Sequence, residues 1–255
     1  MSAISTWHPS SGRTVGEVAL PIPIPARRGR WTVLSVGLVV VLAAGWWVTN
    51  SPIFDLRRLE VRGTAHLTPS AVARLSGLTE RSNVLWLATG PVIRRLEANP
   101  WIVSAGVTRE LPSGVAITIR ERIPVAVTAG PRPMLVAADG VVLGLAPAEA
   151  QLPRVGIPRS WRPGERFPAG AALAVAASFP PGLRPLIERV GEERGGLLVV
   201  RTRDGVRVVY GDASAAPAKS AALQAVLSWA VRNRVRAGSV DVVAPTAPAI
   251  SPAGG

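Results

Sequence analysis

Alternating apolar and polar residues on both sides of a turn mark a strand pair near the middle of the chain. Within Pro100–Val127, two runs rich in Val and Ile flank residues 111–114, Leu-Pro-Ser-Gly, whose last three members favour turns. The positions that alternate onto one apolar face are Val103, Ala105, Val107, Val115, Ile117 and Ile119. This is the period of a half-buried strand, so the segment is predicted to form an antiparallel hairpin whose apolar face needs helices to cover it.

The residues just upstream supply a strand and two helices. Phe54–Arg62 has a strand pattern, and Thr68 followed by proline is a helix start that Gly77 would end. A second helix is predicted to open at Pro91 and to stop at Asn99-Pro100. The order strand, helix, helix, strand, strand over residues 54–123 predicts an α+β module with both helices on one side of a three-stranded sheet.

An uncharged apolar run precedes this module. Trp31–Val48 has eighteen residues without a charge, which as a helix spans about 27 Å, close to the hydrocarbon thickness of a bilayer. Tryptophans stand at its ends and arginines precede it: Trp31, Trp46, Trp47, Arg27, Arg28 and Arg30. We therefore predict a membrane anchor over residues 31–50, with a disordered cytoplasmic tail at 1–30 and the C-terminal part outside the cytoplasm.

Two other interpretations of this run fit the pattern less well. A cleaved signal peptide has a shorter apolar core, and here the small residues 43–45 are followed at once by two tryptophans. A buried core helix is shorter or amphipathic, whereas this run is apolar on all sides. An uncleaved anchor fits the pattern best.

Repeated hairpin signals predict a second, β-rich domain over residues 124–244. Asp139-Gly140 and Asp204-Gly205 are strong two-residue turn signals between apolar runs. Lys219–Arg236 has a helical apolar face, and Ser239–Val243 is predicted to be the last strand. The prolines that follow predict a disordered tail at 245–255.

Charge and candidate chemistry add little to this layout. The net charge is +13, but Lys219 is the only lysine and the arginines are scattered, which favours a solvated basic exterior over a nucleic-acid site. No cysteine is available for a disulfide or a thiolate metal site. His8 and His66 lack a plausible second ligand, and the pair Glu192-Glu193 is expected in a solvated turn. We predict no cofactor, no metal and no enzymatic activity.

Several short motifs in register resemble one known family. They are V-x-G at 61–63, N-x-L-W at 83–86, P-W-I at 100–102, V-T-R-E-L-P at 107–112 and E-R-I-P-V-A at 121–126. Together they resemble the POTRA domain of FtsQ/DivIB cell-division proteins, which also have a cytoplasmic tail, one membrane span and a β domain. POTRA domains of outer-membrane assembly proteins are followed by a long series of barrel strands, for which the remaining chain is too short.

The resemblance implies a non-enzymatic scaffold of the division septum in the cytoplasmic membrane. Its extracytoplasmic domains would bind FtsB, FtsL and possibly other septal proteins and help to control septal peptidoglycan synthesis. The family's docking region maps onto Lys219, Val240, Asp241, Val242 and Val243. Pro245 would shorten a docking strand, because proline cannot donate to a ladder.

Other interpretations of these residues stay open at this stage. Val240 and Val242 are equally explained by core packing, and Lys219 by an ordinary solvated helix position. The arginines Arg57, Arg58 and Arg62 would meet either partners or anionic lipid headgroups. The alternative function is a membrane-anchored module that binds cell-wall polymer through its arginines.

Overall fold

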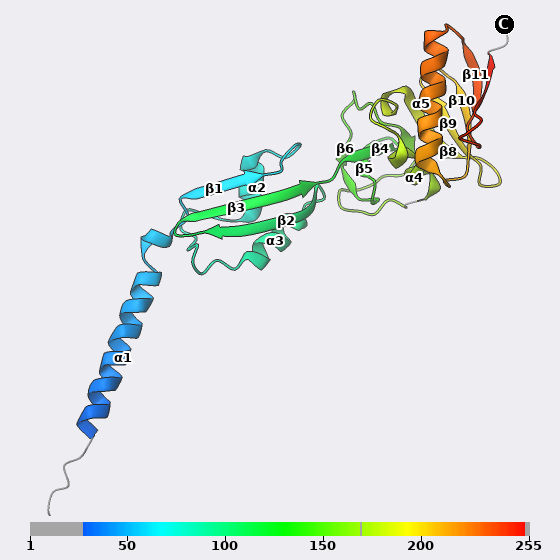
Figure 1. Ribbon diagram of the computed structural model, residues 1–255. Helices are drawn as coiled ribbons and strands as arrows, with labels where there is room; N and C mark the ends of the chain where they lie inside the picture. The colour runs from blue at the N-terminus through cyan, green and yellow to red at the C-terminus, as the bar shows by residue number, and fades with distance from the viewer. Residues whose placement is uncertain (1–27, 169, 253–255) are drawn as a thin grey trace, which may run out of the picture. The chain divides into compact units, whose positions relative to one another are not determined.

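The computed structural model describes residues 28–168 and 170–252, which fall into two units divided after Asn50 (Figure 1). The first unit contains helix α1 (Arg28–Thr49), which begins three residues before the predicted start of the anchor. Arg27 lies outside the described residues, as do residues 1–26 of the predicted tail, whereas Arg28 and Arg30 fall within α1. The run Val33–Phe54, with a mean hydropathy of 1.8, is long and apolar enough to cross a membrane.

The second unit begins with the predicted α+β module. Its elements are η1 (Pro52–Phe54), β1 (Arg58–Arg62), α2 (Pro69–Ser76), α3 (Thr89–Glu97), β2 (Ile102–Glu110) and β3 (Gly114–Glu121). The strands lie in the order β1-β3-β2, with β1 parallel and β2 antiparallel to β3 (Figure 1). The fold class and the order of elements are confirmed.

The core of this module lies between the sheet and the two helices. Val115, Ile117 and Ile119 of β3 are buried together with Val72 of α2 and Leu96 of α3. These β3 positions are as predicted. Burial of such side chains is the main favourable contribution to the module's stability.

The predicted face of β2 is wrong at one position. An irregularity in the β2–β3 register between Ile102 and Ser104 changes the alternation of side chains along the strand. Ile102 is therefore buried in the core, whereas Val103 is only half-buried. Ala105 and Val107 pack against the core as predicted.

The helix boundaries follow local capping chemistry. Thr68 Oγ1 accepts a hydrogen bond from the Ala71 N–H at 3.2 Å, and Gly77 ends α2 with a φ of 68°, a conformation that glycine adopts without strain. Helix α3 begins at Thr89, so Pro91 lies in its first turn rather than at its first residue.

The remaining chain forms a nine-stranded sheet within the described residues. Its strands are β4 (Pro124–Thr128), β5 (Met134–Ala137), β6 (Val142–Leu145), β7 (Arg154–Val155), β8 (Ile187–Glu192), β9 (Leu198–Thr202), β10 (Arg207–Gly211), β11 (Ala237–Asp241) and β12 (Ala249–Pro252). They lie in the order β12-β11-β10-β9-β8-β7-β4-β5-β6. Both predicted Asp-Gly hairpins, β5–β6 and β9–β10, are present.

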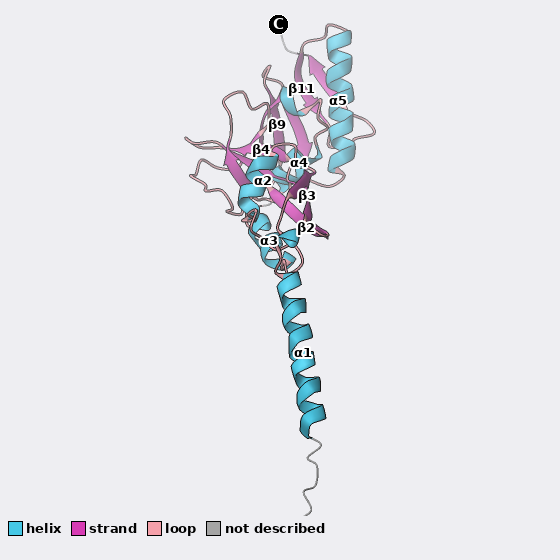
Figure 2. Cartoon of the chain, turned by 90° about the vertical axis from the view of Figure 1, so that its left-hand side faces the viewer, coloured by secondary structure: helices cyan, strands magenta, loops and turns pink. Residues whose placement is uncertain are grey.

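Helices α4 (Ala171–Ser178) and α5 (Ala216–Arg232) pack on this sheet, and η2 (Arg184–Leu186) connects α4 to β8. Both views show α5 alongside the strands near β11 (Figure 2). Leu223 and Leu227 of α5 share one core with Val208, Val240 and other apolar residues of the sheet. The predicted β-rich domain with a C-terminal helix and strand is confirmed.

Two predictions about the C-terminal region are wrong. Helix α5 ends at Arg232, and Arg234 has a φ of 57°, so Arg234 and Arg236, which the predicted helix Lys219–Arg236 included, lie beyond it. Residues 249–252 of the predicted disordered tail form β12, because this segment pairs antiparallel with β11; residues 253–255 lie outside the described residues.

Candidate partner-binding site

The sheet of the second domain ends in a short strand with exposed side chains. β12 pairs with β11 through Val240↔Ile250 and Asp241↔Ala249, and it is the outermost strand on that side of the sheet. Among the described residues no strand pairs with its outer edge. A terminal strand of this kind presents backbone N–H and C=O groups that an added strand can use.

The predicted docking residues in β11 and just after it divide into a buried and an exposed pair. The side chains of Val240 and Val242 lie in the core. Those of Asp241 and Val243 are exposed, and the Asp241 carboxylate accepts a hydrogen bond from the Val243 N–H at 2.8 Å. Only Asp241 and Val243 therefore offer side chains to a partner in this conformation.

Lys219 is buried rather than solvated, with only 3% of its surface exposed. Its ammonium group donates to the Asp212 carboxylate at 2.7 Å and to the Asp212 carbonyl oxygen at 3.1 Å. It also lies 5.6 Å from the centre of the Tyr210 ring. Lys219 is thus placed to hold the turn between β10 and α5, because a buried charge must keep its partners.

The same ion pair governs the ionisation of Asp212. The hydrogen bond from Lys219, followed by hydrogen bonds from the Ser214 hydroxyl and N–H, lowers the pKa of Asp212 from 3.8 to about 2. Bonds to the charged form favour that form. The carboxylate itself is exposed, so salt and water reach it freely.

Tyr210 joins β10 to both helices of the domain through hydrogen bonds that the sequence did not predict. Its hydroxyl donates to the Ala216 carbonyl oxygen at 2.7 Å and shares a 2.9 Å hydrogen bond with Ser220. Ser220 is in turn 2.7 Å from the Ser178 hydroxyl of α4. Tyr210 is the only tyrosine in the chain, which is the one sequence signal that singles it out.

Gly211 brings the end of β10 against two of the predicted residues. A Cβ atom at this position would lie 3.2 Å from Val243 Cγ2 and 3.6 Å from Lys219 Nζ. The glycine also has a φ of +82°, which other residues rarely adopt. Lys219 and Val243 are therefore neighbours around Gly211, although they lie in different elements.

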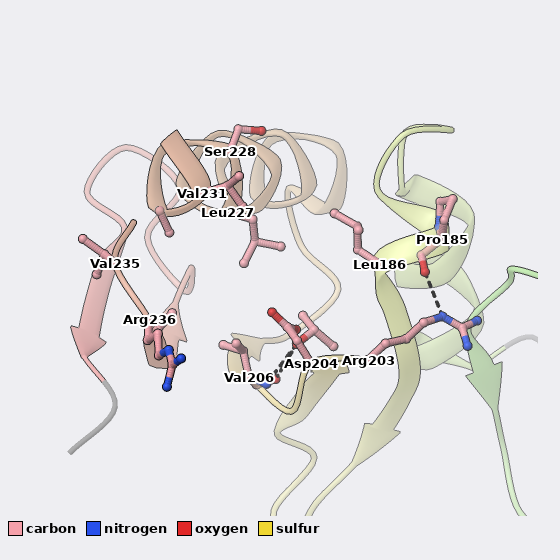
Figure 3. Close-up of a pocket in the computed structure, with 13 residues that line it drawn as sticks. Pro185, Leu186, Arg203, Asp204, Val206, Leu227, Ser228, Val231, Val235 and Arg236 are labelled. Atoms are coloured by element: carbon pink, nitrogen blue, oxygen red, sulfur yellow. Dashed lines mark hydrogen bonds between the residues drawn. The ribbon is translucent and has the colours of Figure 1, made fainter. Parts of the chain in front are cut away.

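A groove of about 890 Å³ runs between α5, the β9–β10 turn and the start of β11. Figure 3 shows Leu227 projecting from α5 toward the side that carries Val206 and Asp204. Arg203 is held at its rim by a 2.8 Å hydrogen bond to the Pro185 carbonyl oxygen (Figure 3). An apolar floor with a charged rim suits peptide binding, and no pair of titratable groups converges there for acid–base chemistry.

The other candidate residues have structural partners. His66 stacks on Trp101 with ring centres 3.6 Å apart, and His8 lies outside the described residues. Glu192 ends strand β8 rather than lying in a turn, and Glu193 forms a 2.8 Å ion pair with Arg207. Over residues 28–168 and 170–252, no group of three or more His, Asp or Glu side chains is placed to hold a metal ion.

Comparison with known families agrees with this architecture. Residues 54–122 match the family model described as "POTRA domain, FtsQ-type". With an apolar helix before it and a β-rich domain after it, the chain is defined as a POTRA-domain protein with a candidate membrane span.

The curated relatives narrow this class. The chain is 30% identical over 211 residues to cell division protein FtsQ of Mycolicibacterium smegmatis, covering 81% of this chain and 62% of the relative. It is 29% identical over 202 residues to FtsQ of Mycobacterium leprae, covering 78% of this chain and 57% of the relative. It is 29% identical over 243 residues to FtsQ of Streptomyces bingchenggensis, covering 89% of this chain and 88% of the relative. The chain thus carries an FtsQ-type POTRA domain and is similar to FtsQ cell-division proteins over most of its length, and it spans about three fifths of the mycobacterial relatives' length.

Proposed function

We propose that this chain is a non-enzymatic scaffold of the cell-division machinery that binds FtsB and FtsL through its extracytoplasmic domains. It would lie at the septum of the cytoplasmic membrane, with its N-terminus inside, and help to control septal peptidoglycan synthesis. The support comes from the FtsQ relatives, from the FtsQ-type POTRA domain and from the apolar helix α1. The observation that carries the binding proposal is the exposed edge of β12.

The proposed docking site is the β11–β12 edge with Asp241 and Val243 beside it. A partner strand would pair with the backbone of β12, which extends the predicted site by one strand. Val240 and Val242 would contribute by holding β11 in the core, and Lys219 by fixing the turn next to Val243. Their proposed role is to position the edge rather than to touch the partner.

Capture of the FtsB ectodomain by the full chain in detergent tests this proposal. Deleting residues 239–255 would remove most of β11 together with the buried side chains of Val240 and Val242 and should unfold the domain, so a single substitution is preferable. Ser251→Pro removes an N–H from β12 and disrupts the edge strand to which a partner strand would add. The matched control is Ser160→Pro, which changes an exposed loop serine.

The expected result is a loss of FtsB affinity of about tenfold or more for Ser251→Pro, since the disrupted edge would lose several backbone hydrogen bonds to the partner and each contributes roughly 0.5–1.5 kcal/mol. Ser160→Pro should bind FtsB like the wild type. Equal capture by both variants would contradict docking at β12. Strong, salt-sensitive binding to isolated peptidoglycan without FtsB capture would favour the wall-polymer module instead.

A further inference from the structure

Three large apolar side chains project into solvent at one end of the POTRA domain. Ile53 is 58% exposed, Trp86 61% and Leu111 60%. They come from three separate segments: η1, the loop between α2 and α3, and the turn between β2 and β3. Exposed apolar residues that gather on one surface mark a contact site more often than scattered ones do.

Hydrogen bonds gather these segments at the same end of the domain. The Val84 N–H donates to the Phe54 carbonyl oxygen at 2.7 Å, and the Arg57 N–H donates to that of Ser113 at 2.9 Å. The Arg109 guanidinium donates to the Leu85 carbonyl oxygen at 2.9 Å. The neighbours of Ile53, Trp86 and Leu111 are therefore bonded to one another, and we call this surface the three-residue patch.

The chain itself limits how far this patch can be from the end of α1. Helix α1 ends at Thr49, and the apolar run continues to Phe54. Phe54 follows Asn50 by four positions along the chain, a span of at most about 14 Å. If α1 crosses the bilayer, the patch must lie within reach of the membrane surface whatever the orientation of the domain.

The charged residues around the patch suit a lipid surface, but they are not the main source of the attraction to it. Arg57, Arg58 and Arg109 are exposed there and would meet phosphate groups. Asp55 and Glu110 lie close by and offset part of that charge. The apolar side chains therefore provide most of the attraction, and added salt should weaken the contact only slightly.

We propose that this end of the POTRA domain rests on the lipid bilayer, with Ile53, Trp86 and Leu111 in the interfacial layer. Tryptophan and aliphatic side chains flanked by arginine favour that layer, where apolar rings and charged headgroups meet. The inference depends on the membrane anchoring included in the proposed function. It adds a second, peripheral contact that would fix the orientation of the extracytoplasmic domains.

The absence of cysteine allows a site-specific test in the full chain. Leu111→Cys carries an environment-sensitive fluorophore in vesicles of phosphatidylethanolamine and phosphatidylglycerol that contain lipids with a headgroup nitroxide. The matched control is Leu145→Cys, a leucine of the β domain with 67% exposure. Trp86→Cys provides a second patch position, and Val41→Cys, with acyl-chain nitroxides, reports insertion of α1.

We expect the label at residue 111 to be quenched several-fold more strongly than the label at residue 145, with a blue-shifted emission that persists at high salt. The same quenching and blue shift are expected at residue 86, so the Trp86→Cys variant tests the proposal if the Leu111→Cys variant folds poorly. If residue 41 is quenched but residues 86 and 111 behave like residue 145, the patch proposal is overturned while the anchor stands. If residue 41 is not quenched, the anchor fails and the patch proposal fails with it.

Discussion

The hydroxyl of Tyr210 is predicted to hold α5 against the sheet. Tyr210→Phe removes one oxygen atom and keeps the buried ring. The hydroxyl makes two close hydrogen bonds, to the Ala216 carbonyl oxygen at 2.7 Å and to the Ser220 hydroxyl at 2.9 Å. Both partners lie in the first turns of α5, the helix that also carries Lys219.

The size of the effect follows from these two bonds. A typical intramolecular hydrogen bond contributes roughly 0.5–1.5 kcal/mol net, so losing both should lower the unfolding free energy of the β domain by about 1–3 kcal/mol. That corresponds to a roughly 5- to 160-fold change in the equilibrium between the folded and the unfolded domain.

Amide hydrogen exchange of the full chain measures this change locally. The exchange of amides in α5 and β10 should speed up by the same factor wherever exchange requires opening of the domain. Amides of β3 in the POTRA domain serve as an internal control and should be unaffected. Unchanged exchange in α5 and β10 would refute the view that this hydroxyl holds the helix.

The remaining predictions concern both domains. Ile117→Ala, in the POTRA core, should destabilise that domain by about 2–5 kcal/mol in denaturant unfolding, whereas Thr118→Ala at an exposed position should not. Thr68→Ala removes the cap of α2 and should cost about 1 kcal/mol by the same assay; full stability would exclude a capping role. The pKa of Asp212 is lowered to about 2, so its stabilising effect is present above pH 4 or so and is lost as the pH falls from about 4 to about 2. A carboxyl NMR titration should show this pKa, and Lys219→Met should return it toward 3.8; an unchanged pKa would rule out Lys219 as the main cause.

Elements with local signals could be predicted from sequence alone. Thr68 and Gly77 carry the chemistry of helix ends, and Asp139-Gly140 and Asp204-Gly205 carry that of tight turns. The strands β3, β5, β6, β9 and β10 follow from alternation or from their position beside those turns. In each case the residues that decide the structure are close in sequence.

Elements decided by distant partners could not be predicted. β12 follows Pro248 and ends in Pro252, and it becomes a strand only because β11 lies beside it. β8 pairs in parallel with the two-residue strand β7, a contact with no local signal. Lys219 was expected in solvent because its burial depends on the Asp212 turn, and Val103 was misplaced by a bulge that the alternation does not show.

At the candidate site, too, some features are decided by local sequence and others by distant partners. The sequence predicted Val240, Asp241, Val242 and Val243 as docking residues, and all four lie in or next to β11. It did not separate the buried positions from the exposed ones, because that depends on which face of β11 meets α5 and the rest of the core. The exposed edge itself belongs to a strand that the sequence did not predict.

The most direct test of the scaffold proposal is amide exchange of the full chain with and without the FtsB ectodomain. Binding at the proposed edge should slow the amide exchange of residues 249–251 in β12 and leave the edge strand β2 of the POTRA sheet unchanged. Slower exchange confined to other parts of the protein, with β11 and β12 unaffected, would contradict docking at this edge.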